Sequence, residues 1–247
     1  MAIIMNDIKI SGSGKISGGE YDAISVSGSA KISGSIGCSE MKVSGSCKVE
    51  GDVFCRGDVR VSGSCKIDGS VTAENSLHVS GSFVCEGNLK AGKIAASGGI
   101  TINKNISASS VEISGGIKVG GDISGEQVEL RGCADIGGLL NAEQVSIELD
   151  GTGINKSEIE SIGGGTITVK RRGEGKWGIF GVWNKNYPTL NVKGSIEGDS
   201  ISLTDTSASV VRGKNVAICE NCRIGRVEYS EGYTVSEGSQ VGEAVKI

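Results

Sequence analysis

The chain of 247 residues carries 25 basic and 29 acidic side chains, contains 41 glycines, and has only 4% aromatic residues. So little aromatic bulk excludes a thick conventional core, and the apolar residues are expected to be buried in a thin, repetitive arrangement. The formal net charge of −4 argues against a general nucleic-acid binder, because affinity for phosphates needs a high density of basic residues.

The N-terminal stretch MAIIMND reaches an acidic residue after too few apolar positions for a signal peptide. No run approaches the ~20 apolar residues that a membrane-spanning helix needs. We therefore expect a cytoplasmic protein, in which the eight cysteines are reduced thiols and not a disulfide framework.

The first 150 residues are a repeat with a period of 17 or 18 residues. KVSGSCKVEGDVFC (42–55) and RVSGSCKIDGSVTA (60–73) are two successive copies. The apolar residues that mark each copy are Val26, Val43, Val61, Val79, Ala96, Ile113, Leu130 and Ile147. A second apolar residue stands two positions before each of them, which is the spacing of a strand with one buried face.

Each repeat contains two further pairs of alternating apolar residues, so every unit predicts three short strands. Glycines separate the pairs, and we expect them at corners that require a positive φ. This pattern predicts an all-β fold, a right-handed three-sided parallel β-helix with 17–18 residues per rung. Val43, Val61 and Val79 should then lie directly over one another, about 4.8 Å apart.

Five cysteines fall on these inward positions, where a free thiol packs as a small apolar side chain. They are Cys38, Cys47, Cys55, Cys65 and Cys85, and the repeat places Cys47 and Cys65 on adjacent rungs. Cys219 and Cys222 form a single CxxC pair and are weak candidates for a metal or redox site. A zinc site needs four ligands and no second pair is visible, so the alternative is a corner of a rung.

The pattern divides the chain into three parts: a regular β-helix over 1–150, an irregular rung with an insertion over 151–189, and a continuation with an acidic tail over 190–247. The insertion combines basic and aromatic residues, among them Arg171, Arg172, Lys176, Trp177, Phe180 and Trp183. One hypothesis is a reversible contact with an anionic membrane or a partner, because aromatic and basic residues favour that interface. The other is a loop that covers an edge or caps the rod.

Two further surfaces are candidates for assembly. The first rung carries Ile3, Ile4, Ile8 and Ile10 with little polar cover, and its unpaired backbone groups predict a polymer contact. Outward columns of serine and lysine form a regular polar face, whose lysines are Lys15, Lys31, Lys48, Lys66 and Lys118. That face serves either solubility and edge protection or lateral contacts between filaments.

We find no sequence pattern that indicates catalysis or a cofactor. The single histidine, His78, falls on an outward column, and neither a P-loop nor a dinucleotide-binding motif is present. The corners are also too short to carry the acidic clusters of a polysaccharide lyase or hydrolase.

The Gly-punctuated VSGS repeats resemble bactofilins, bacterial polymer-forming cytoskeletal proteins with a right-handed parallel β-helix. The stretch IEGDSISLTDTSASVVRGKNVAICENCRIGRVEYSE (196–231) resembles the ending of the branch found in Gram-positive bacteria. This resemblance implies assembly end to end, without nucleotide, into filaments that scaffold client proteins at the membrane. The alternative that remains is a β-helical enzyme or a carbohydrate-binding protein, which a concave site with convergent titratable residues would favour.

Overall fold

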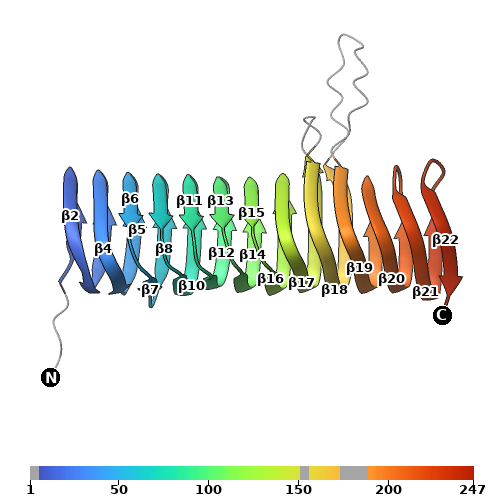
Figure 1. Ribbon diagram of the computed structural model, residues 1–247, viewed down its shortest axis with the longest axis horizontal. Helices are drawn as coiled ribbons and strands as arrows, with labels where there is room; N and C mark the ends of the chain where they lie inside the picture. Colours follow the sequence, from blue (N-terminus) through green and yellow to red (C-terminus); the bar gives the residue numbers. More distant parts are fainter. Residues whose placement is uncertain (1–5, 151–155, 173–188) are drawn as a thin grey trace, which may run out of the picture. The chain divides into compact units, whose positions relative to one another are not determined.

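The fold is an all-β parallel solenoid, seen in a computed structural model that describes residues 6–150, 156–172 and 189–247. The chain winds in about 13 turns, or rungs, of about 17 residues each. It divides into two units, Met1–Gly125 and Glu126–Ile247, which are described in turn (Figure 1).

Three short strands make up each rung of unit 1, and adjoining strands merge where a corner is gentle. The strands are β1 (Ile8–Ile10), β2 (Ser13–Glu20), β3 (Ala23–Val26), β4 (Ser29–Cys38), β5 (Glu40–Val43), β6 (Ser46–Val49), β7 (Val53–Cys55), β8 (Asp58–Val61), β9 (Ser64–Ile67), β10 (Val71–Val79), β11 (Ser82–Cys85), β12 (Leu89–Ala96), β13 (Gly99–Ile102), β14 (Ile106–Ile113) and β15 (Gly116–Val119). The strand β16 (Ile123–Arg131) crosses the boundary between the units.

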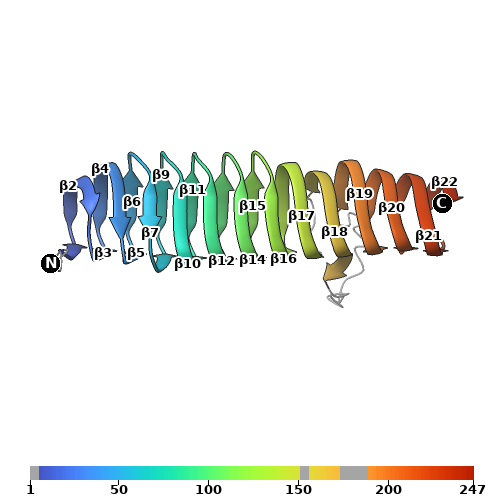
Figure 2. The same cartoon turned by 90° about the horizontal axis from the view of Figure 1, so that it is seen from below.

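The strands of unit 1 pair in three parallel ladders. The first ladder runs through β1, β3, β5 and β8 into the second halves of β10, β12 and β14. The second joins the first halves of β2 and β4 to β6, β9, β11, β13 and β15. The third joins the ends of β2 and β4 to β7 and the first halves of β10, β12 and β14 (Figure 2). Three ladders are what a three-sided coil requires, whereas its right-handedness stays a prediction.

The inward columns have the register that the repeat predicts. Val61 pairs in register with Val43 on one side and Val79 on the other, and Cys47 pairs with Cys65. All five cysteines assigned to the interior are free and buried. Both predictions are therefore confirmed, and the thin core is built from stacked aliphatic and thiol side chains.

The corner glycines between the first and second ladders are needed for a reason other than the expected one. Gly45, Gly63 and Gly81 are not among the residues with a positive φ, so that expectation is wrong at these positions. It holds at the corner glycines Gly34 and Gly132, whose φ values are 102° and 118°. A Cβ on Gly45 would lie 1.9 Å from the carbonyl oxygen of Gly28 in the preceding rung. Close approach between successive corners, and not backbone handedness, therefore excludes a side chain here.

Polar side chains connect the rungs at the corner between the second and third ladders. The backbone N–H of Ser70 donates to Asp52 Oδ1 at 2.7 Å, and the N–H of Asn88 donates to Ser70 Oγ at 3.1 Å. Asn88 Oδ1 accepts the N–H of Asn105 at 3.2 Å, and Asn105 Oδ1 accepts that of Asp122 at 2.8 Å. Each side chain thus replaces the ladder bond that the corner interrupts.

Unit 2 uses longer strands that continue around the corners. They are β17 (Cys133–Asp150), β18 (Lys156–Arg172), β19 (Thr189–Leu203), β20 (Thr206–Ile218), β21 (Arg223–Val235) and β22 (Gln240–Lys246). Each pairs in parallel with the next, for example through Ile147 and Val169. Within the segment interpreted as an irregular rung, residues 156–172 therefore form a strand that is paired on both sides, because SEIESIGGGTITVKR keeps the inward alternation.

We expect Asn105→Ala to lower the free energy of unfolding by about 1 kcal/mol, because it removes one acceptor from the corner ladder. A thermal melt measures the change. The control is Lys104→Ala on the exposed neighbouring side chain. Equal melting temperatures for the two variants would show that the ladder contributes nothing to stability.

Candidate functional site

The first described rung is less covered than the rung that follows it. Ile8 and Ile10 of β1 are half-buried, whereas their partners in register, Ile24 and Val26, are each 1% exposed. Within the described residues β1 pairs only with β3. Ile3 and Ile4, the other two predicted polymer contacts, lie outside the described residues.

The base of the insertion contains a buried ion pair that the sequence did not indicate. Arg171, near the end of β18, donates from Nε to Asp205 Oδ2 at 2.8 Å and from Nη2 to Asp205 Oδ1 at 2.7 Å. Asp205 is 1% exposed, and Asn221 Nδ2 also donates to its Oδ1 at 3.1 Å. The guanidinium that was predicted to face a membrane or partner is thus engaged within the chain.

Asp205 holds both sides of the insertion. Its carboxylate binds Arg171 before residues 173–188, and its carbonyl oxygen accepts the N–H of Leu190 after them at 3.0 Å. Asp205 adopts a φ of 51°, a conformation that Asp tolerates better than most residues. One corner residue therefore contacts the described chain on both sides of residues 173–188.

Of the remaining predicted contact residues of the insertion, only Arg172 lies within the described residues. Arg172 is exposed at the end of β18, with its guanidinium 3.9 Å from the Asp150 carboxylate. Lys176, Trp177, Phe180 and Trp183 lie outside the described residues, so their contact role stays a prediction.

Cys219 and Cys222 flank a corner. Cys222 is 1% exposed and its thiol donates to the carbonyl oxygen of Leu203 at 3.2 Å, while burial raises its pKa to about 11. Cys219 is half-buried, with Sγ 3.7 Å from Ser202 Oγ. Across the described residues no group of three or more His, Cys, Asp or Glu side chains is placed to hold a metal ion.

Three lysines of the polar face, Lys31, Lys48 and Lys66, pair with acids on the same or a neighbouring rung. Lys48 lies between Glu50 at 3.7 Å and Asp68 at 3.1 Å, and Glu50 also accepts Lys31 at 2.7 Å. Lys66 repeats the arrangement one rung further with Asp68 and Glu86. The hydrogen bond to Asp68 raises the pKa of Lys48, and that to Lys31 lowers the pKa of Glu50. These exposed pairs contribute little stability individually.

Two cysteines pack against each other inside the third ladder. Cys38 and Cys55 are partners in register and are fully buried. The hydrogen bond between their thiols lowers the pKa of Cys55 to about 7 and raises that of Cys38. Their complete burial favours a packing role over a redox role.

The part of the chain that the structure describes contains no helix able to cross a membrane. His78 is exposed on its outward column, as predicted.

A family model described as "Bactofilin: Polymer-forming cytoskeletal" matches residues 3–75 and 61–157, which together exceed half of the chain. The chain belongs to the bactofilin family. This family is structural and non-enzymatic, which agrees with the resemblance seen in the repeats.

Two relatives come from the Gram-positive bacterium Bacillus subtilis (strain 168), and both are described as uncharacterized proteins. YhbF is 41% identical over 91 residues, which are 37% of this chain and 35% of YhbF. YhbE is 46% identical over 52 residues, which are 21% of this chain and 22% of YhbE. The chain thus matches about a third or less of the length of either relative, and no solved structure matches it.

Sequence reasoning about this bactofilin missed two residues that the structure makes prominent. Asp205 reads as a surface residue in the sequence, since nothing local indicates that Arg171 reaches it across 34 positions. Phe54 stands on an outward column and is 42% exposed. The sequence did contain a signal for Phe54, because an aromatic residue at an outward position breaks the pattern of the repeat.

We expect Arg171→Met to destabilise the protein by about 3 kcal/mol, because it leaves the Asp205 carboxylate buried without its cation. Asn at position 205 tolerates the same backbone conformation, so the double variant Arg171→Met, Asp205→Asn should recover most of that loss. Chemical denaturation of the two variants measures the difference. If the double variant were as unstable as the single one, the ion pair between Arg171 and Asp205 would not be the source of the stabilisation.

Proposed function

We propose that the chain assembles end to end, without nucleotide, into filaments that hold partner proteins at the inner face of the cell membrane. The family is polymer-forming, so self-association has a basis independent of this proposal. The observation that carries the end-to-end mode is the half-buried state of Ile8 and Ile10, beside fully covered equivalents one rung later. Covering them with another copy would bury apolar surface.

The membrane part of the proposal rests on the insertion. Trp177, Phe180 and Trp183 lie in a segment with Lys176 and beside the exposed Arg172, a composition that suits the interface of an anionic leaflet. Asp205 holds Arg171 and Leu190, the described residues near the two ends of this segment. A segment of this length would attach reversibly and would not span the bilayer.

We expect the double variant Ile8→Glu, Ile10→Glu to shorten or abolish filaments while its thermal melt stays close to that of the parent protein. Two carboxylates at the contact would be desolvated without partners, whereas in the free chain they reach water. Negative-stain electron microscopy without added nucleotide measures filament length. The matched control, Ser29→Glu, Ser64→Glu, adds the same charge on the exposed polar face. Filaments that are equally long in both variants would place the contact elsewhere.

We expect Trp177→Ala, Trp183→Ala to fold and polymerise but to lose co-sedimentation with anionic liposomes, because the aromatic anchors are gone. Neutral liposomes are the control for the electrostatic component, and the parent protein should bind them less. Unchanged binding to anionic liposomes would remove the membrane role. A large fall in melting temperature would instead favour the alternative that the insertion covers or caps the solenoid.

A further inference from the structure

One outward column of unit 1 has a composition that the rest of the repeat does not share. It lies on the third ladder and follows one in-register position over five rungs: Glu20, Gly37, Phe54, Thr72 and Lys90. Glu20 and Lys90 stand on opposite sides of Phe54, each two rungs from it, and the column continues beyond Lys90 to Ser107.

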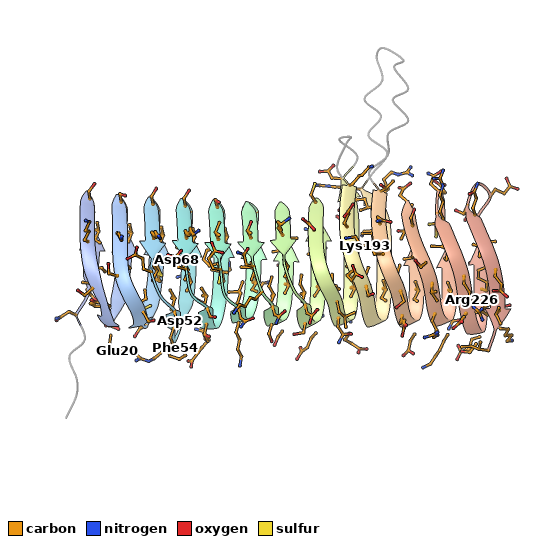
Figure 3. The ribbon with its side chains drawn as sticks, viewed as in Figure 1. Glu20, Asp52, Phe54, Asp68, Lys193 and Arg226 are labelled. Atoms are coloured by element: carbon orange, nitrogen blue, oxygen red, sulfur yellow. The ribbon has the colours of Figure 1, made fainter. Side chains whose placement is uncertain are left out.

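Phe54 is the centre of this column and is 42% exposed. Because Gly37 has no side chain, the ring has no in-register neighbour on that side, and a shallow groove of about 490 Å³ opens beside it. The side chain of Glu20 leans over Gly37 toward Arg56 and pairs with it at 3.0 Å. Figure 3 shows Glu20, Asp52 and Phe54 along the same edge of unit 1.

Both charged ends of the column are accessible. The Glu20 side chain remains 61% exposed in spite of its ion pair with Arg56. Lys90 is exposed and forms no ion pair with any described residue. An exposed aromatic residue between an accessible acid and an accessible base is the composition of a contact surface rather than of a solvated face.

We propose that this column docks against the same column of a second copy, with the two solenoids antiparallel about a two-fold axis at Phe54. Reversing the order of the column places Phe54 against Phe54, Gly37 against Thr72 and Glu20 against Lys90. Phe54 meets its equivalent, the branched Thr72 meets Gly37 with the Glu20 side chain that leans over it, and each acid meets a base. A surface that complements its own reversed copy is what a two-fold interface requires.

The charge pattern favours a second copy over other occupants. A basic peptide would be repelled by Lys90, and an acidic one by Glu20, whereas the column itself carries both charges at matching separations. Rungs repeat every ~4.8 Å in both copies, so the four-rung distance from Glu20 to Lys90 is the same on either side of the interface.

A single such contact is too small to hold a dimer of free chains, because stable interfaces bury ~1,600 Å² in total. Filaments would present the column once per subunit, so many weak contacts would act together along two neighbouring filaments. This amplification rests on the proposed end-to-end assembly. The contact would join filaments side by side and would leave their length unchanged.

A charge-swap series tests the geometry. Lys90→Glu places acid against acid and should reduce low-speed pelleting of paired filaments about fivefold or more, with high-speed pelleting of single filaments unchanged. Adding Glu20→Lys to that variant restores opposite charges across the axis and should restore pairing. Phe54→Ser should abolish pairing. The controls are Lys42→Glu and Val84→Ser, equivalent changes on the other two ladders.

The rescue by the double swap is the decisive result. The proposal would be overturned if filaments of Lys90→Glu still paired, if the double swap failed to restore pairing, or if the parent protein formed only single filaments.

The second readout needs no filaments: a photo-crosslinking benzoylphenylalanine at position 54 should join two copies near position 54 in concentrated protein. Crosslinks that map to the first rung, or no crosslink between copies, would count against the contact. If the protein formed no filaments but still gave a crosslink between the two positions 54, the end-to-end proposal would be rejected and the contact at Phe54 would stand.

Discussion

The stacking of one rung on the next in register is the constraint on which the rest of this structure depends. Every backbone bond of a ladder joins equivalent positions in successive rungs, so each residue lies over its own counterpart about 4.8 Å away. The residue type at each position must therefore pack well against the residue at the same position in the next rung. Aliphatic residues and cysteines fill the inward columns, and the Gly45 corner admits no side chain because the carbonyl of Gly28 occupies the space. Where ladder bonds fail, polar side chains such as Asn88 and Asn105 continue the connection between rungs.

The same constraint explains why departures from a column carry information. A residue that does not match its column does not stabilise the stack of rungs, so another role must explain why it is there. Phe54 beside Gly37 is such a departure, and it lies where an accessible acid and an accessible base flank it at equal separations. Asp205 is another, since a buried carboxylate at a corner is costly unless a cation meets it, and Arg171 meets it with two hydrogen bonds. We propose that Phe54 faces a second copy, whereas Asp205 stabilises the chain itself.

Assembly of a polymer-forming family from such a fold is governed by surfaces of different kinds. The first described rung leaves Ile8 and Ile10 half-buried, so covering it with another copy would bury apolar surface. On the polar face Lys48 is already held between Glu50 and Asp68, so a contact there gains little. End contacts are therefore expected to determine whether the chain polymerises, and side contacts only how polymers lie together.

The sequence by itself determined the period, the three strands per rung, the inward columns and the stacking of Val43, Val61 and Val79, because a repeat encodes each contact between neighbouring rungs many times. It also placed five cysteines inside correctly. What only the tertiary structure decided are features that occur once: the engagement of Arg171 by Asp205, the close approach that excludes side chains at the Gly45 corner, and the relation of Phe54 to Lys90 and Glu20. Such contacts leave no periodic trace, because they depend on where two particular side chains end in space and not on a rule shared by every rung.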